Sequence, residues 1–189
     1  QLLQERSFHP WEGGEGKVLR QYTSAHILLG QHALEANDAH LALEHFGKAM
    51  SPPENLGEAY HLLQAKADVS YWTGMALKAL GRSPEADAAF QASTHEAGDF
   101  QAMAVTEHSE LSYYRGLSLI ELGRHDDAAI LFEDLKSFAQ KELTTPAKID
   151  YFATSLPLLL VFEDDLDQAK QNHARNLIEL AEQGLQQTR

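Results

Sequence analysis

Residues 70–93 read SYWTGMALKALGRSPEADAAFQAS, and two further stretches repeat their pattern without gaps. Residues 26–49 read HILLGQHALEANDAHLALEHFGKA, and residues 112–135 read SYYRGLSLIELGRHDDAAILFEDL. In each copy the fifth residue is glycine, the twelfth is a small turn residue, the seventeenth is alanine and the twenty-first is phenylalanine. The four columns are Gly30, Gly74 and Gly116; Asn37, Gly81 and Gly123; Ala42, Ala86 and Ala128; and Phe46, Phe90 and Phe132. Matched columns of this kind indicate an internal repeat.

The columns predict that each copy is a hairpin of two helices. A small residue in the middle of the first helix lets a second helix approach closely, and Gly or Asn supplies the left-handed conformation that ends a helix. The alanine and phenylalanine, four residues apart, lie on one face of the second helix. The stretches between the turns lack alternation with a period of two and are rich in helix-forming residues. We therefore expect an all-α protein.

These units resemble tetratricopeptide repeats (TPRs), helix-turn-helix modules of about 34 residues that stack into a right-handed solenoid. The glycine column matches the small residue of the family's first helix, Gly81 and Gly123 match its turn glycine, and the alanine and phenylalanine columns match its second helix. The resemblance covers roughly residues 22–140. It departs from the family at His26, Ser70 and Ser112, where a bulky residue is usual, and the proline that commonly closes each unit is missing.

The repeat is longer than that of the family. Gly30 and Gly74 are 44 residues apart, and Gly74 and Gly116 are 42 apart. We expect the extra residues to lengthen the first helix of each unit, so that one long helix covers 56–80 and another runs from Asp99 or Phe100 to 122. A degenerate fourth hairpin is expected from helices over 147–156 and 165–185. The predicted organisation is a connector over 1–20 and a repeat domain over 21–189, with units at 22–53, 54–97, 98–141 and 146–187.

Composition and charge limit the partners. The formal net charge is −13, which repels phosphate backbones and anionic lipid surfaces, so neither nucleic acid nor a membrane is an expected partner. The chain has no cysteine, and its longest apolar run, 158–162, is far shorter than a membrane-spanning helix. The chain begins with Gln1 and shows no basic-then-apolar leader, so we interpret it as a fragment of a longer, cytoplasmic protein.

A narrower resemblance lies in RSFHPWEGGEGKVLRQYT over 6–23 and YFATSLPLLLVFEDDL over 151–166. Both are similar to the C-terminal TPR region of large bacterial multidomain proteins, whose preceding domain, of unknown function, is suspected of carbohydrate-related work. The resemblance implies an accessory module beside an upstream domain.

The run GGEGK over 13–17 raises the question of a nucleotide site. A phosphate-binding loop requires a glycine where Trp11 stands and a hydroxyl residue where Val18 stands, so the pattern fails. We interpret the run as a turn into the first helix, with His9 and Trp11 contacting the upstream domain or its ligand.

Metal and catalytic patterns are equally weak. No two of the ten histidines are four residues apart, and we expect solvated surface histidines. The acidic group at 163–167 lacks the order of a calcium loop and fits the start of a helix better. No cofactor, metal or catalytic residue is predicted, and the fragment is not expected to be an enzyme.

The TPR register implies which residues line the concave groove formed by the first helices. These are Ser24, Ile27, Gln31, Leu34 and Glu35; Asp68, Tyr71, Met75 and Lys78; and Glu110, Tyr113, Leu117 and Glu121. Some family members hold a peptide carboxylate with Lys, Arg and Asn at such positions, but those places are occupied by other residue types here. In the competing interpretation the tyrosines pack into neighbouring helices and fill the groove.

Three functions remain open at this stage. The first is a non-catalytic scaffold whose groove binds a protein or peptide segment, or the upstream domain of its own chain. The second is an accessory carbohydrate-binding or substrate-positioning module that uses Trp11 and the inner tyrosines as stacking faces. The third is a structural module that forms a homodimer.

Overall fold

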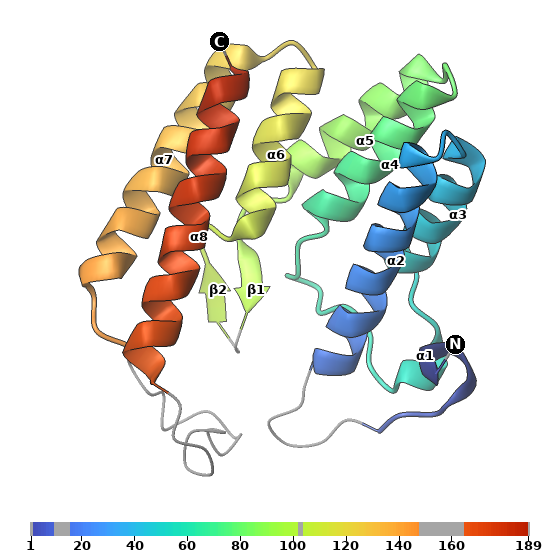
Figure 1. The fold of residues 1–189 in the computed structure, drawn as a ribbon, viewed down its shortest axis with the longest axis horizontal. Helices are drawn as coiled ribbons and strands as arrows, with labels where there is room; N and C mark the ends of the chain where they lie inside the picture. Colours follow the sequence, from blue (N-terminus) through green and yellow to red (C-terminus); the bar gives the residue numbers. More distant parts are fainter. Residues whose placement is uncertain (1, 10–15, 102–103, 148–164, 189) are drawn as a thin grey trace.

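The computed structural model describes residues 2–9, 16–101, 104–147 and 165–188, and most of this part of the chain is helical (Figure 1). The helices are α1 (Leu2–Glu5), α2 (Lys17–Glu35), α3 (Ala39–Met50), α4 (Ala67–Ala79), α5 (Ser83–His95), α6 (Glu110–Glu121), α7 (His125–Thr144) and α8 (Leu166–Gln187). A 3₁₀ turn, η1 (Glu54–Leu56), and a two-stranded antiparallel hairpin, β1 (Asp99–Gln101) and β2 (Ala104–Thr106), interrupt them. The expected helical character is confirmed.

Each copy of the repeat is a hairpin of two packed helices, α2 with α3, α4 with α5 and α6 with α7. The glycine of the first helix lies under the phenylalanine ring of the second. A Cβ atom added at Gly74 would stand 2.5 Å from a ring carbon of Phe90, and the equivalent atoms at Gly30 and Gly116 would also overlap their rings. The three phenylalanines and three alanines of the columns are almost fully buried. The columns therefore specify the packing inside each hairpin.

The turn column has the predicted geometry. Asn37, Gly81 and Gly123 have φ values of 60°, 70° and 73°, in the left-handed region. In the second hairpin the Gly81 N–H donates to the Lys78 carbonyl and the next N–H donates to Leu77. The other two turns repeat these paired hydrogen bonds, which satisfy carbonyls that the helix end would otherwise leave without partners.

The hairpins pack side by side, and α8 extends the row. Each second helix contacts the first helix of the next unit, so α3 packs on α4, α5 on α6 and α7 on α8. In Figure 1, α8 runs in the same direction as α2 and α6. Gly184 of α8 lies against the Phe132 ring, which is therefore held between Gly116 and Gly184. We expected α8 to be the second helix of a fourth hairpin, but it packs where the first helix of a fourth unit would lie.

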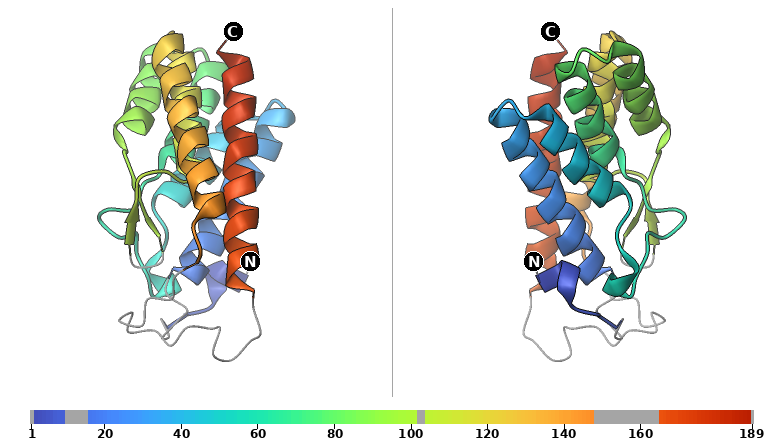
Figure 2. Two further views of the ribbon diagram at one scale, coloured as in Figure 1. Left: turned by 90° about the vertical axis from the view of Figure 1, so that its left-hand side faces the viewer. Right: turned by 90° about the vertical axis from the view of Figure 1, so that its right-hand side faces the viewer.

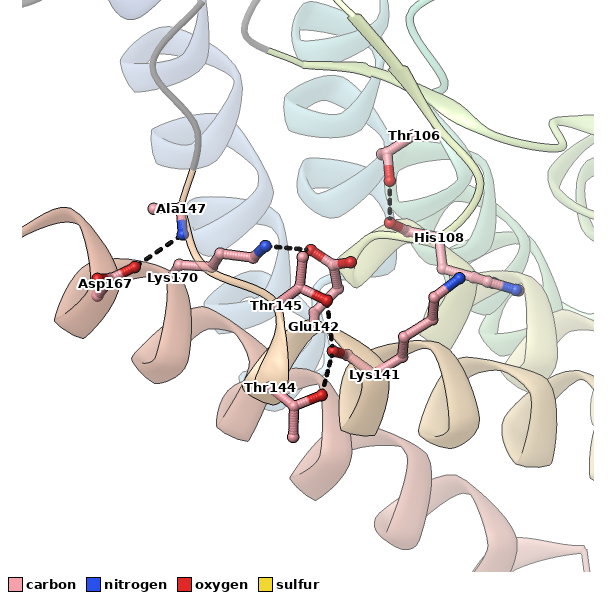
Figure 3. Close-up of polar contacts among 9 residues, drawn as sticks. All are labelled: Thr106, His108, Lys141, Glu142, Thr144, Thr145, Ala147, Asp167 and Lys170. Atoms are coloured by element: carbon pink, nitrogen blue, oxygen red, sulfur yellow. Dashed lines mark hydrogen bonds and ion pairs between the residues drawn. The ribbon is translucent and has the colours of Figure 1, made fainter.

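Polar contacts near its N-terminus hold α8 to the end of α7 (Figure 3). Lys170 and Glu142 form an ion pair at 3.0 Å, and the Ala147 N–H donates to Asp167 at 2.7 Å. Asp165 caps the helix by accepting from the Gln168 N–H at 2.9 Å. The prediction that the acidic group starts a helix is confirmed for these two aspartates, whereas residues 163 and 164 and nearly all of the helix expected over 147–156 lie outside the described part.

The prediction of lengthened first helices is wrong. Helix α4 begins at Ala67 and α6 begins at Glu110, and each is 12 or 13 residues long. Residues 57–66 form a loop after η1, and the hairpin β1–β2 occupies the equivalent place before α6. Gly57 and Gly98 introduce these two segments with φ values of 73° and 77°, which no helix can contain. The extra residues of each repeat are thus inserted in front of the first helices.

The N-terminal segment packs against the start of the first insertion. The Phe8 N–H donates to the Asn55 carbonyl at 2.8 Å, and the Asn55 side chain donates to the carbonyls of Leu3 and Arg6. Gly16, with φ 74°, makes the turn into α2, as the interpretation of the glycine run expects. Helix α2 begins at Lys17, so residues 17–20 belong to the first helix rather than to the connector.

Candidate interaction surface

Several residues expected on the concave wall are core residues in the structure. Ile27, Tyr71 and Leu117 are at most 9% exposed. The Tyr71 ring contacts Phe90 of its own hairpin and Tyr114 of the next one, with centroids 6.0 and 5.8 Å apart. Burial raises the pKa of Tyr71. The face of Tyr71 is therefore occupied by neighbouring rings, as the filled-groove interpretation expects, and is not free to stack on a sugar.

Other wall residues pair with one another across adjacent helices. Lys78 of α4 forms an ion pair with Glu121 of α6. Glu110 of α6 pairs with His173 of α8 at 3.1 Å, and this contact raises the pKa of the histidine. The Gln187 side chain donates to the Tyr113 hydroxyl at 3.3 Å. These contacts tie the first helices and α8 together along the wall.

The remaining predicted wall residues differ in how far their side chains are exposed. Ser24 and Glu35 are exposed, whereas Gln31, Leu34 and Met75 are half-buried. His9 is exposed, and Trp11 lies outside the described residues, so the contact expected at the junction stays a prediction. None of the predicted wall residues borders the hollow of about 420 Å³ that lies between α6 and α7.

The two inserted segments, by contrast, meet in space. The loop 57–66 and the hairpin β1–β2 lie side by side and project from the same edge of the molecule (Figure 2). The rings of His61 and Phe100 stack with centroids 3.9 Å apart and an interplanar angle of 17°. Around this contact Leu62, Leu63 and Val105 are 99%, 59% and 59% exposed. We call these five residues the insert surface.

The base of the insertions is held firmly while this surface stays exposed. The Tyr60 hydroxyl donates to the Ala49 carbonyl at 2.8 Å, and the Lys66 ammonium lies 5.0 Å above the Tyr60 ring. The Lys66 N–H donates to the Glu96 carboxylate. The Ser93 hydroxyl, which is buried, donates to the carbonyl at the start of α4 at 3.0 Å. The loop is therefore fixed at both ends, and its apolar tip has no partner in the core cluster beneath it.

Carboxylates concentrate beneath the insert surface. Asp68, at the start of α4, has its pKa raised to about 6, mainly by burial and further by the charges of Glu96 and Asp99. Hydrogen bonds from backbone N–H groups oppose this shift only in part. The three carboxylates lie close enough to interact, and the Lys66 ammonium lies at the same base of the insertions.

Two histidines contradict the expectation that they are solvated. His26 and His108 are 5% and 8% exposed. The Nδ1 atoms of His26 and His45 lie 2.9 Å apart, so one ring donates to the other, and burial is the main reason that the pKa of His26 falls to about 4. His26 occupies the column where the TPR family has a bulky residue, and it fills that place with its ring.

Two negative findings apply to the residues that the structure describes. They contain no cluster of three or more histidine or carboxylate side chains that could hold a metal ion. No helix in this part of the chain combines the length and hydrophobicity needed to cross a membrane.

The length of the repeat is a sequence feature that could have indicated the insert surface, although the sequence-based prediction interprets it as longer helices. The period of 42 to 44 residues exceeds that of a plain helical hairpin, and surplus residues in a repeat commonly form loops on one face. The long helix expected over 56–80 includes Leu62 and Leu63, so the prediction gives no indication that these two side chains are exposed on a loop.

No protein-family model matches the chain, and no solved structure matches it. The likeness to TPR proteins therefore depends on the repeat columns and on the hairpin packing described above.

Proposed function

We propose that this chain is a TPR-like, non-catalytic scaffold and that it binds a protein segment through the insert surface. The supporting observation is the convergence of the two insertions. The insertions are the residues by which each unit is longer than a TPR, and they belong to two different units. They nevertheless stack on each other through His61 and Phe100. Segments needed only to connect helices have no reason to carry exposed leucines at their tips.

The chemistry of the surface favours an apolar partner segment with positive charges. Burying an exposed leucine or valine contributes about 1.5–3 kcal/mol, so Leu62, Leu63 and Val105 offer several kcal/mol before the costs of association are subtracted. The net charge of the chain, −13, favours a partner segment that carries Lys or Arg. A segment of the upstream domain with this chemistry fits the surface as well as a separate protein.

This proposal is tested by removing the apolar tips. The double variant Leu62→Ser/Leu63→Ser and the single variant Val105→Ser are compared with the unaltered chain as baits in the source lysate, with quantitative mass spectrometry of the captured proteins. We expect both variants to capture at least tenfold less of the same partner, because the side chains removed in each variant contribute buried area to one contact.

The matched control is Leu28→Ser, at a leucine that is 55% exposed and belongs to α2 rather than to the insertions. It is expected to retain the partner. Loss of the partner from the Leu28 variant alone would contradict the proposal. A dimer seen by light scattering that disappears in the Leu62→Ser/Leu63→Ser variant would also contradict it, since the surface would then be occupied by a second copy.

A further inference from the structure

A hollow of about 420 Å³ lies at the end of α5, between α6 and α7, and shares no residue with the insert surface. On α7 it is bordered by residues 127, 130, 131 and 134, whose spacing places them on one face of that helix. The full lining is Thr94, His95, Arg115, Leu119, Arg124, Asp127, Ile130, Leu131 and Asp134. Helix α5 stops at His95, and Thr94 and His95 at this end border the hollow together with Arg115 of α6.

Arg115 is the unusual residue of this hollow. Its guanidinium is half-buried, and its Nε atom is buried without a hydrogen-bond partner in the part of the chain that the structure describes. Burial lowers its pKa, and the charge of Glu96 offsets this only in part. Arginine keeps its proton in spite of such a shift, so a buried N–H donor remains unsatisfied. An unsatisfied buried donor is costly to the fold, and Arg115 is also one of the residues that border the hollow.

One cationic and one acidic side chain of the lining form no ion pair within the described part of the chain. Arg124 is already paired with Asp127, since its Nε lies 2.7 Å from a carboxylate oxygen. Arg115 and Asp134 therefore remain as the charged groups of the lining that form no ion pair among the described residues. The apolar part is provided by Leu119, Leu131 and Ile130, of which Ile130 is 62% exposed.

We propose that this hollow binds a single carboxylate carried on a short apolar group. The Arg115 guanidinium donates to the carboxylate oxygens through its terminal N–H groups, and the apolar group lies against Leu119, Leu131 and Ile130. A guanidinium matches the planar geometry of a carboxylate. Asp134, which has no ion pair among the described residues, repels a doubly charged phosphate more strongly than a carboxylate of one charge. The hollow lies away from the groove positions at which TPR proteins hold peptide carboxylates.

The test uses probes that differ only in the carboxylate. N-acetyl-leucine and N-acetyl-leucinamide are titrated into the intact chain, and binding is followed through the methyl NMR signals of Ile130, Leu119 and Leu131. The acid is expected to shift these signals and to bind at least tenfold more tightly than the amide. Equal binding of the two probes, or no shift with the acid, would overturn the proposal.

The role of Arg115 is tested by Arg115→Gln, which should weaken binding of the acid at least tenfold. The control is Arg82→Gln, the equivalent of Arg124 in the second unit, which forms an exposed pair with Glu85 outside the hollow. It should leave binding unchanged. Undiminished binding by a folded Arg115→Gln variant would contradict the assignment, and the acid and amide comparison still applies if that variant does not fold.

The source of the carboxylate is resolved by a second pair of probes, acetyl-Leu-Glu-Leu-amide and acetyl-Leu-Gln-Leu-amide. Binding of the glutamate peptide as tight as that of N-acetyl-leucine, and tighter than that of the glutamine peptide, supports an acidic side chain of a partner protein. Binding of N-acetyl-leucine alone supports a free acid or a chain terminus. These outcomes do not depend on whether the insert surface binds a protein.

Discussion

The contact between glycine and phenylalanine in each hairpin predicts that Gly→Ala, which usually stabilises a helix, destabilises this chain. Gly→Ala in the middle of a helix normally stabilises a protein by about 1 kcal/mol, because alanine has the higher helix propensity. At Gly74 the new Cβ would stand 2.5 Å from the Phe90 ring, which is only 1% exposed and is packed against Tyr71. Gly74→Ala should therefore destabilise the chain.

The magnitude follows from two opposing terms. Overpacking a buried site costs about 1–3 kcal/mol, and here a ring enclosed by two helices must move by a large fraction of an ångström. The propensity gain of about 1 kcal/mol offsets part of this cost. We expect a net loss of about 1–2 kcal/mol in the free energy of unfolding, measured by urea denaturation with circular dichroism.

Gly47 provides the matched control, because it is also inside a helix, α3, and an added Cβ would meet nothing within 4 Å. Gly47→Ala should stabilise the chain by about 0.5–1 kcal/mol. Phe90→Leu should make room for the methyl group, so that the double variant with Gly74→Ala loses less than the sum of the two single losses. Stabilisation by Gly74→Ala, or additive losses in the double variant, would refute the account of the hairpin.

Three further predictions concern stability. The pKa of His26 is lowered from 6.5 to about 4, so between these values the unfolded chain binds a proton that the folded chain does not, and the free energy of unfolding should fall by up to about 2.5 kcal/mol from about pH 7 to about pH 4.5. Denaturation curves of His26→Gln should show a smaller fall, and an unchanged pH dependence would contradict the burial of this ring. Phe132→Ala, which empties the space between α6 and α8, should cost about 3–5 kcal/mol, whereas Ile130→Ala on the exposed face should cost less than about 1 kcal/mol. Lys78→Ala, which removes the partly exposed pair with Glu121, should cost less than about 1 kcal/mol, and a loss several times larger would show that the wall depends on this pair.

The helical hairpins could be predicted from the sequence because their determinants are local and repeated. A glycine, a turn residue and a phenylalanine at fixed spacing leave few ways to pack two helices, and three copies made the pattern visible. The position of α8 could not be predicted in the same way, because Gly184 meets Phe132 only through tertiary packing across 52 residues of sequence.

The insertions were predicted incorrectly for a physical reason. Residues 56–66 have a helix-forming composition, but Gly57 adopts a left-handed conformation and Leu56 is fully buried in the N-terminal cluster. Tyr60 is bound to the carbonyl of Ala49, which holds the loop across the end of α3. Such contacts outweigh intrinsic propensity, which contributes only tenths of a kcal/mol per residue.

The groove residues show a similar limit. The TPR register predicts an inner wall, but it does not distinguish an open wall from one in which residues such as Tyr71 are covered by neighbouring rings. Tyr71, Tyr113 and Tyr114 contact one another or neighbouring aromatic rings because α4 and α6, the first helices of two adjacent units, bring large side chains to the same layer.

The most direct measurement of the proposed function is site-specific photo-crosslinking of the full chain in its source cells. A photoreactive amino acid is placed in turn at Leu62, at Val105 and at Leu28, and the cross-linked proteins are identified by mass spectrometry. Because Leu62 and Val105 belong to different insertions but to one surface, both positions should capture the same protein, and Leu28 should not. Different proteins at the two insertion positions, or capture from Leu28 alone, would contradict the proposal that the insertions form one binding surface.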